Sequence, residues 1–264
     1  ELHITASAVS QQVKALEEQL GVLLFERQPR GLLLTDAGRR YAGDIRPHLA
    51  ALDEAARRLR GTRALRVSLM PPLASRVVLP HLADFQALHP DITLRLDTRV
   101  QTVDLQQRQA DLAVRYGTPP WPGCVHRKLS DLQVQAICPP AIAREYDLVA
   151  QPQNLARAPL VHMSERAQSW PLLLGRLGLV RDAAARDFHV DDYPAAIEAA
   201  QTLGVALAVL PLEKPLLDSG RVTAVGPAIG PLPEAMYAVM LAERQADPAI
   251  AAFLAWLETR LAAL

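Results

Sequence analysis

The chain has 264 residues, half of them hydrophobic, and its 28 Lys and Arg residues balance 28 Asp and Glu residues. This length allows more than one compact domain, and a net charge of zero excludes a uniformly basic nucleic-acid-binding protein. A run of about 18 apolar residues is absent, and Cys124 and Cys138 have neither metal-binding nor redox spacing, so we expect a cytoplasmic protein without a transmembrane helix.

The first predicted element is an amphipathic helix over residues 5–20. At about 100° per residue, its apolar side chains fall within an arc of roughly 60°: Val9, Val13, Leu16 and Leu20. Polar side chains occupy an opposite arc of roughly 100°: Ser7, Ser10, Gln11, Lys14 and Glu18. A face of small and polar residues can approach a nucleic-acid groove closely, whereas the alternative is an ordinary surface helix with a solvated face.

A hairpin is predicted directly after this helix. Gly21 is typical of a helix end, and residues 22–25 form a short apolar run suited to a strand. In residues 28–31 Pro stands second and Gly fourth, which suits a type I turn, and residues 32–34 return as a second strand. Arg27 and Arg30 lie near the tip, where arginines contact phosphates and position a protein rather than read sequence. The helix and the hairpin together indicate a winged DNA-binding unit.

A long helix is predicted after the hairpin, with Thr35 as its N-cap and Asp36 near the positive end of the helix dipole. Its apolar residues recur at spacings of three, four and three, as in a coiled-coil seam: Leu49, Leu52, Ala56 and Leu59. Pro47 is expected to kink this helix because it lacks an N–H group. The helix packs either on the following domain or against a second copy of the chain, and residues 61–63 form a hinge.

From residue 64 onward, short apolar strands alternate with helices, which predicts parallel α/β sheets. The first set has strands at 65–70, 92–97 and 111–116, and helices at 73–88, interrupted by Pro80, and at 103–109. The second set has strands at 134–138, 160–163, 188–190 and 205–210, and a helix at 194–202. A strand at 235–241 and a helix at 248–261 close the chain. We expect two hinged lobes of about 100 residues each, the first completed by the end of the chain.

A long motif runs through the winged unit. Residues 6–41 read ASAVSQQVKALEEQLGVLLFERQPRGLLLTDAGRRY and contain the pattern AVSxQxxxLExxLGxxLFxR…LTxAG. They resemble the winged helix-turn-helix of LysR-type transcriptional regulators. The resemblance implies that residues 5–20 are the recognition helix, that the linker helix pairs two chains, and that the remainder has the two-lobe architecture of periplasmic binding proteins. It also implies that the family's first helix and most of its second are missing, so we expect an N-terminally truncated chain.

This resemblance divides the chain into three parts. They are a partial winged helix-turn-helix at 1–34, a linker and dimerisation helix at 35–63, and an effector-binding domain at 64–264, with lobe I at 64–134 and 240–264 and lobe II at 135–239. Three segments resemble the glycine-cleavage and β-lactamase regulator subgroup: DLAVRYGTPPWPG at 111–123, SWP at 169–171 and HVDDYPAAIEAAQTLGVALAVLP at 189–211. Similar proteins often carry a hydroxyl residue where Pro72 stands, so a donor for an effector carboxylate is missing there.

Two sets of site residues follow. Contacts with double-stranded promoter DNA are expected from the recognition helix and the wing: Thr5, Ser7, Ser10, Gln11, Lys14, Arg27 and Arg30. In open α/β sheets small molecules bind beyond the carboxyl ends of strands, near helix N-termini. Those ends predict an effector site at Met70, Pro72, Leu73, Arg99, Val100, Arg115, Tyr116, Asp192 and Tyr193.

The charges at this site suggest the chemistry of its ligand. Arg99 and Arg115 suit an anionic group, and Asp191 or Asp192 suits an amine, which favours an amphoteric metabolite such as an amino acid or a peptide-like fragment. The alternative is that these charges are solvated and that Asp191 or Asp192 caps the next helix.

Catalysis finds no support in the sequence. The motifs GxSxG, HExxH, GxxxxGK[ST] and GxGxxG are absent, and the seven histidines are scattered without metal-ligand spacing, so we expect neither an enzyme nor a cofactor or metal site. Trp256 is expected on the packed face of the last helix and Trp170 at the border of the second lobe. The sequence favours a ligand-responsive transcriptional regulator acting as a homodimer or homotetramer, with no membrane partner. The alternative is a free-standing small-molecule receptor of the same two-lobe fold.

Overall fold

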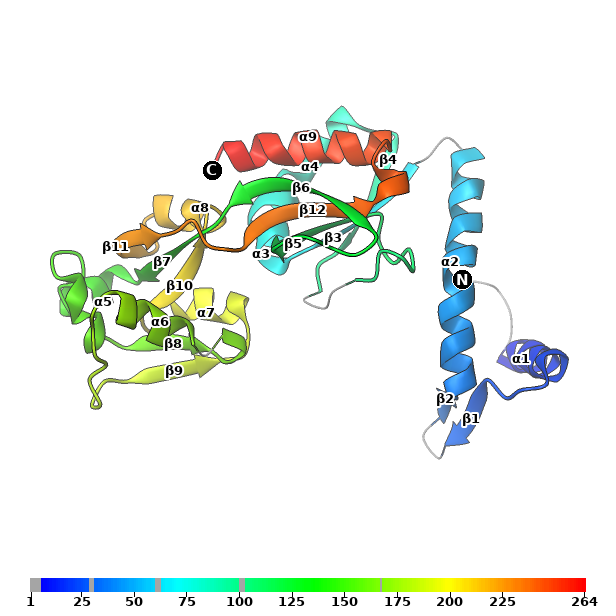
Figure 1. Ribbon diagram of the computed structural model, residues 1–264, viewed down its shortest axis with the longest axis horizontal. Helices are drawn as coiled ribbons and strands as arrows, with labels where there is room; N and C mark the ends of the chain where they lie inside the picture. The colour runs from blue at the N-terminus through cyan, green and yellow to red at the C-terminus, as the bar shows by residue number, and fades with distance from the viewer. Residues whose placement is uncertain (1–5, 29–30, 60–62, 100–102, 167) are drawn as a thin grey trace. The chain divides into compact units, whose positions relative to one another are not determined.

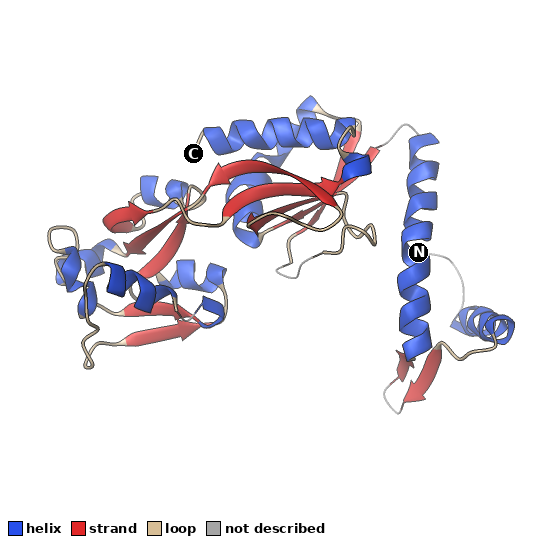
Figure 2. Cartoon of the chain, in the orientation of Figure 1, coloured by secondary structure: helices blue, strands red, loops and turns tan. Residues whose placement is uncertain are grey.

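The computed structural model describes residues 6–28, 31–59, 63–99, 103–166 and 168–264 (Figures 1 and 2). Thr5, Arg30 and Val100, which the sequence placed in binding sites, lie outside these residues. The chain divides into two compact units, residues 1–63 with 106–109 and residues 64–105 with 110–264. A search of the described residues for a membrane-spanning helix finds no candidate, since none combines sufficient length with sufficient hydrophobicity.

The first unit is a helix, a hairpin and a long helix. Its elements are α1 (Ala6–Leu20), β1 (Phe25–Gln28), β2 (Gly31–Leu34) and α2 (Asp36–Leu59). The strands are antiparallel, with Phe25 opposite Leu34 and Gln28 opposite Gly31. The predicted helix–hairpin–helix order is therefore confirmed.

The first strand begins at Phe25, so the prediction of a strand over residues 22–25 was wrong except at its last residue. Gly21, with φ at +69°, ends α1, and the Glu17 carboxylate then accepts hydrogen bonds from the N–H groups of Leu24 (2.7 Å) and Phe25 (3.0 Å). Residues 22–24 consequently form a connection between helix and strand. The Glu17 side chain binds backbone N–H groups that would otherwise be available for hydrogen bonding between β-strands.

Thr35 caps α2 as predicted, since its hydroxyl oxygen accepts a hydrogen bond from the Gly38 N–H at 2.9 Å. The Thr35 N–H donates to the carbonyl of Leu24, which ties the start of α2 to the hairpin. The helix continues through Pro47, and Leu49 and Leu52 on its surface are 59% and 68% exposed. This part of the predicted seam is open to solvent within the described residues.

The second unit has two lobes, and no sheet is shared between them within the described residues (Figure 1). The first lobe has the strand order β4-β3-β5-β12-β6. These strands are β3 (Arg63–Leu69), β4 (Ile92–Asp97), β5 (Leu112–Gly117), β6 (Cys124–Asp131) and β12 (Ala235–Leu241). β3 and β5 are parallel, but β12 runs antiparallel to both β5 and β6. The sheet is therefore mixed rather than parallel as predicted, and the strand β6 was missed.

The place of β12 also moves the expected lobe boundary. We expected the chain to return to the first lobe at residue 240, yet β12 pairs with first-lobe strands from Ala235 onward. The return therefore falls in residues 230–234, between β11 and β12. The chain reaches β12 from the second lobe, and this direction of approach explains its antiparallel pairing.

The helical segment after β3 is irregular. It consists of α3 (Pro71–Leu73), a π-helical turn (Ala74–Val78), a 3-10 turn (Leu79–His81) and α4 (Leu82–Leu88). Pro80 lies in the 3-10 turn, and the predicted interruption is confirmed, because proline cannot donate the backbone hydrogen bond of a regular helix. The helix predicted at 103–109 was wrong: residues 105–108 form turns, and Arg108 adopts a φ of +52°.

The first-lobe core lies between the sheet and its helices. The final helix, α9 (Pro248–Ala262), is capped by Asp247, whose carboxylate accepts from the Ala249 N–H at 2.8 Å. Trp256 is buried, as expected, and packs with Phe85 and Phe253 at ring-centroid distances of 5.3 and 5.6 Å. This aromatic group joins α9 to α4 on one face of the sheet.

The second lobe contains two small sheets. One has the antiparallel order β10-β7-β11 and the other pairs β8 with β9 in parallel. The strands are β7 (Gln133–Cys138), β8 (Leu160–Met163), β9 (Asp187–Val190), β10 (Ala206–Leu210) and β11 (Thr223–Ile229). The helices are α5 (Pro140–Glu145), α6 (Ser169–Arg176), α7 (Tyr193–Ala199) and α8 (Lys214–Asp218). Two short 3-10 turns also belong to this lobe, Pro152–Ala156 and Ser164–Arg166. A further 3-10 turn, Ala242–Arg244, follows β12 in the first lobe.

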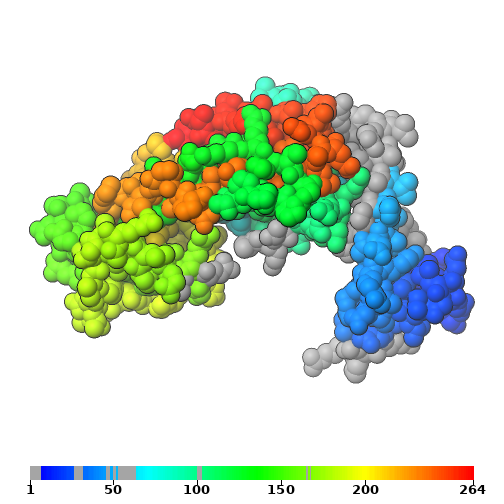
Figure 3. Space-filling model, viewed as in Figure 1, coloured from blue at the N-terminus to red at the C-terminus, as the bar shows by residue number. Residues whose placement is uncertain are grey.

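In the space-filling view the green, yellow and orange residues of the second lobe gather into one body at the left of the picture (Figure 3). Two chain crossings join the lobes, one between β6 and β7 and one between β11 and β12.

Candidate functional site

A cavity of about 510 Å³ lies between the two lobes of the second unit. Its wall is mainly apolar, with a smaller number of charged and hydroxyl groups. Seven of the nine residues predicted for an effector site line it: Met70, Pro72, Arg99, Arg115, Tyr116, Asp192 and Tyr193. The strand-end rule therefore brings together groups from β5, from the start of α3 and from the start of α7. A largely preformed apolar cavity with a few polar groups is typical of a small-molecule site.

Two predicted residues do not join the cavity wall as described. Leu73 is fully buried and packs into the first-lobe core, because α3 begins at Pro71 and turns the Leu73 side chain away from the cavity. Val100 lies outside the described residues.

Arg115 is a fixed cation in the cavity wall. Its Nη2 donates to the Ser68 hydroxyl at 2.6 Å, and its Nη1 donates to the carbonyl of Val114 at 2.9 Å. Its Nε is buried and has no hydrogen-bond partner among the described residues. Burial lowers the pKa of Arg115, but a guanidinium remains protonated at physiological pH. The side chain therefore presents a desolvated positive charge to the cavity.

Arg99 is a weaker candidate for anion binding because it already holds a carboxylate. Its Nε and Nη2 donate to Asp97 at 2.9 and 2.5 Å. The hydrogen bond from Arg99 lowers the pKa of Asp97 to about 2, so this carboxylate stays charged at neutral pH. Much of the positive charge of Arg99 is thus offset.

Two hydroxyl groups lie in the cavity wall beside these arginines. The Tyr193 hydroxyl accepts a hydrogen bond from the Val209 N–H at 2.8 Å. The Tyr116 hydroxyl is buried and has no hydrogen-bond partner among the described residues, and burial raises the pKa of Tyr116. Buried hydroxyls are normally paired, but this oxygen is covered by protein, so within the described part of the chain it is an unsatisfied polar group of the wall rather than an open contact for a ligand.

Asp192 has the structural role that the sequence left open. Its carboxylate accepts from the Ala195 N–H at 2.8 Å and caps α7, while the residue also lines the cavity. The capping alternative is confirmed for Asp192. This bond occupies one carboxylate oxygen and leaves the other for further contacts.

The sequence did not identify two further arginines at the cavity. Arg166 and Arg176 line it and are exposed, the first at the end of a 3-10 turn and the second at the end of α6. Glu234 is the acidic group that comes from the crossing between β11 and β12. Arg176 and Glu234 do not follow the carboxyl end of a predicted strand, and this explains why the strand-end rule missed them. Arg166 comes three residues after the predicted strand 160–163, so the same rule could have found it.

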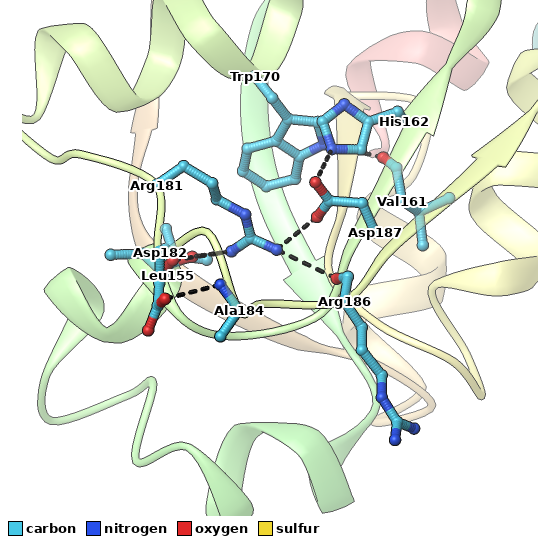
Figure 4. Close-up of polar contacts among 10 residues, drawn as sticks. Leu155, Val161, His162, Trp170, Arg181, Asp182, Ala184, Arg186 and Asp187 are labelled. Atoms are coloured by element: carbon cyan, nitrogen blue, oxygen red, sulfur yellow. Dashed lines mark hydrogen bonds and ion pairs between the residues drawn. The ribbon is translucent and has the colours of Figure 1, made fainter.

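Trp170 is buried in the cavity wall and is held by a polar network of the second lobe (Figure 4). Its indole Nε1 donates to the carbonyl of Val161 at 2.8 Å. Arg181 donates to the carbonyls of Leu155 and Arg186 and forms an ion pair with Asp187. This network fixes α6 and the loop before β9 to β8, and it therefore supports one wall of the cavity.

His162 belongs to the same network. Its Nε2 lies 3.4 Å from Asp187 Oδ2 (Figure 4). Its ring stacks on the ring of His189, with centroids 5.0 Å apart. Burial lowers the pKa of His162, although the nearby Asp187 opposes the shift. The imidazole is therefore neutral at physiological pH.

The first unit presents the polar face expected of a groove-contacting helix. Four predicted DNA-contacting residues on α1 are exposed: Ser7, Ser10, Gln11 and Lys14. Lys14 lies 3.7 Å from Glu18 in an exposed i,i+4 ion pair, which contributes little to stability and leaves the lysine available to phosphate. Arg27 lies in β1, and its side chain is outside the described structure, as are Thr5 and Arg30.

Comparison with known proteins gives two family matches. Residues 1–39 match the bacterial regulatory helix-turn-helix protein of the lysR family, and residues 59–262 match the LysR substrate binding domain. The glycine cleavage system transcriptional activator of Escherichia coli is 32% identical over 277 residues, covering 100% of this chain and 87% of that protein. The activator AmpR of Pseudomonas aeruginosa is 37% identical over 213 residues, covering 79% of this chain and 71% of that protein.

Two solved structures are also similar to this chain. The effector domain of AmpR from Pseudomonas aeruginosa has a TM-score of 0.61 and 30% identity, covering 76% of this chain and 95% of that domain. Full-length CrgA from Neisseria meningitidis, a LysR-type regulator, has a TM-score of 0.61 at 22% identity and supports the fold alone.

Proposed function

The chain belongs to the LysR family of bacterial transcriptional regulators, and we propose that the cavity between its two lobes binds the small molecule to which the regulator responds. The observation that supports this assignment is that one chain contains both a helix with an exposed polar face next to a hairpin and a cavity between two lobes, lined mainly by apolar residues. LysR regulators bind promoter DNA and small-molecule effectors and form oligomers. The alternative of a receptor without a DNA-binding unit is not supported, because residues 1–39 match the family's helix-turn-helix.

The cavity chemistry favours an amphoteric molecule with an apolar body, such as an amino acid or a peptide-like fragment. Arg115 offers a desolvated cation for a carboxylate, and Asp192 and Glu234 offer carboxylates for an amine. The apolar wall around them would bury the rest of the molecule. A strongly cationic ligand is disfavoured, because Arg166 and Arg176 add positive charge at the same cavity.

Calorimetric titration tests this proposal with free amino acids and short dipeptides as the probes. At least one probe should release heat, and Arg115→Ala should weaken its binding by about tenfold or more, since a charge-assisted hydrogen bond contributes about 1.5–3 kcal/mol. Arg99→Ala should have a smaller effect, because Asp97 already holds that side chain. Arg95→Ala, an exposed arginine of β4 outside the cavity wall, serves as the control. No heat across the panel, or equal losses in all three variants, would overturn it.

For promoter DNA, we propose base contacts from Ser7, Ser10 and Gln11 of α1, and phosphate contacts from Lys14 together with Thr5, Arg27 and Arg30. Phosphate contacts weaken binding to all sequences alike when removed and reduce the salt dependence, whereas base contacts alter sequence preference.

Gel-shift titration on the DNA upstream of the gene provides the measurement. Lys14→Ala should reduce affinity for specific and scrambled DNA by a similar factor, and Gln11→Ala should reduce the preference between them. Glu145→Ala, an exposed change in α5, should alter neither quantity. The assignment of roles fails if Lys14→Ala changes sequence preference or Gln11→Ala leaves it unchanged.

We further propose that the regulator acts in the cytoplasm, where promoter DNA is found, and that it has no catalytic activity of its own. The relatives named above are transcriptional activators, which supports this role.

A further inference from the structure

A polar link connects the two lobes outside the cavity wall. Arg76 lies in the π-helical turn of the first lobe, and its Nε donates to Glu213 Oε2 at 3.1 Å. Glu213 belongs to the second lobe, where it precedes α8. Arg76 Nη2 also lies 4.0 Å from Glu198 in α7, at the limit of an ion pair. One arginine thus reaches from the first lobe to two acidic residues of the second.

Glu213 is the critical member because it is 1% exposed. Burial raises its pKa, and the charge and hydrogen bond of Arg76 oppose that rise. An unpaired charge buried to this extent is strongly unfavourable, so Glu213 needs its partner from the other lobe whenever it is ionised. The free energy of this contact therefore depends on how close the lobes are.

Tyr193 joins this link to the cavity. Tyr193 lines the cavity at the start of α7, its hydroxyl accepts a hydrogen bond from the Val209 N–H at 2.8 Å, and it is among the groups that lower the pKa of Glu213. Tyr116, from the other lobe, lines the same cavity. A molecule in the cavity would therefore touch Tyr193, which acts on the buried carboxylate of Glu213.

We propose that Arg76, Glu213 and Tyr193 form an interlobe latch, in which Glu213 is the positioning residue that sets the angle between the lobes and Tyr193 reports occupancy of the cavity to it. The latch holds the lobes in one arrangement when the cavity is empty. A ligand that moves Tyr193 changes the surroundings of the Glu213 carboxylate and so shifts the population of lobe arrangements. The response to ligand rests on the proposed effector site, whereas the latch itself does not.

The latch is tested without ligand by measuring the distance between spin labels on the two lobes. Labels are attached at Gln86→Cys in α4 and Glu145→Cys in α5, both exposed, in a Cys124→Ser background; the remaining Cys138 is fully buried. The parent chain, mixed with excess unlabelled chain so that each oligomer carries one labelled copy, should give one narrow distance distribution by pulsed electron paramagnetic resonance. Arg76→Met and Glu213→Gln should each add a second population at a different distance.

Variants that weaken the latch to different degrees distinguish it from a general loss of rigidity in the protein. Tyr193→Phe should shift the distribution in the same direction but less, because Arg76 still holds Glu213, and Glu198→Gln should shift it least, since that contact is long and exposed. Arg76→Lys should partly restore the parent distribution by keeping the charge. Arg95→Met, in β4, is the matched control and should be indistinguishable from the parent.

The proposal is overturned if Arg76→Met and Glu213→Gln both keep the parent distribution while circular dichroism shows folded protein. It is also overturned if Arg95→Met produces the same second population. Should Arg76→Met fail to fold, Glu213→Gln, which preserves side-chain size, decides the question. Because no ligand is added, failure of the amino-acid titration would leave this result unaffected, and failure of the latch would leave the effector site standing.

Discussion

Trp170 stabilises the cavity wall both through a hydrogen bond and through its packing. Its Nε1 donates to the carbonyl of Val161, and the side chain is 2% exposed. Trp170→Phe keeps an aromatic ring but removes the donor, so we expect a loss of about 1–3 kcal/mol in the free energy of unfolding, from a buried carbonyl deprived of a partner. Urea denaturation of this variant against Trp121→Phe, a partly exposed tryptophan of the first lobe, measures it. Equal losses in both variants would contradict the role of the hydrogen bond.

His162 gives a pH dependence whose sign follows from its environment. Burial lowers the pKa of this histidine below its usual 6.5, so the unfolded chain takes up the proton more readily than the folded one. Stability should therefore fall as pH drops below about 6.5 and level off below the pKa of the folded state. Thermal unfolding between pH 5 and 8 should show a smaller fall in His162→Gln. A His162→Gln variant that keeps the full pH dependence of the parent would contradict this assignment.

At the scale of elements, the start of α2 depends on a close approach that only glycine permits. A Cβ atom on Gly38 would lie 2.0 Å from the carbonyl oxygen of Leu24, which is backbone and cannot rotate away. Gly38→Ala should therefore separate α2 from the hairpin and weaken DNA binding. Gly43→Ala, in the same helix with nothing near its Cβ position, should instead stabilise the unit by about 0.5–1 kcal/mol. Thermal unfolding of the two variants decides this; destabilisation of similar size in both would contradict it.

Helix caps and one strand were predicted correctly because the residues that determine them are close together in the sequence. Thr35 and Asp192 cap α2 and α7 through bonds to residues three positions away, and β12 spans the predicted residues 235–241. The strand neighbours of β12 could not be predicted from the sequence. β12 enters the first sheet from the second lobe, and no pattern within it specifies β5 and β6 as its neighbours. The helix at 103–109 failed for a related reason: Val103 and Leu105 are buried against Ala113 and Val239, so tertiary packing and the positive φ of Arg108 replaced the helical period.

The candidate site shows the same limit at the scale of the whole molecule. Strand ends and a helix start identified Arg115, Tyr116, Asp192 and Tyr193, because parallel strands and the helices after them converge on one edge. Arg76 and Glu213 are separated by 137 residues and meet only through the arrangement of two lobes. A contact of that kind has no periodicity or spacing in the sequence, and it became visible only with the fold.

Assembly is the property of the whole molecule that α2 is expected to govern. Leu49 and Leu52 are 59% and 68% exposed on a helix whose apolar residues follow a coiled-coil spacing, and large apolar side chains in such a seam are buried when two helices pair. Leu52→Glu would place a charge in that seam, so the dimer should dissociate at protein concentrations at least tenfold higher than for the parent chain, as measured by sedimentation equilibrium. Val149→Glu, an equally exposed apolar residue of the second lobe, should leave association unchanged. If Val149→Glu dissociates the dimer and Leu52→Glu does not, pairing runs through the effector-binding domain rather than through the linker helix, and loss of DNA binding in α2 variants would then need a cause other than dissociation.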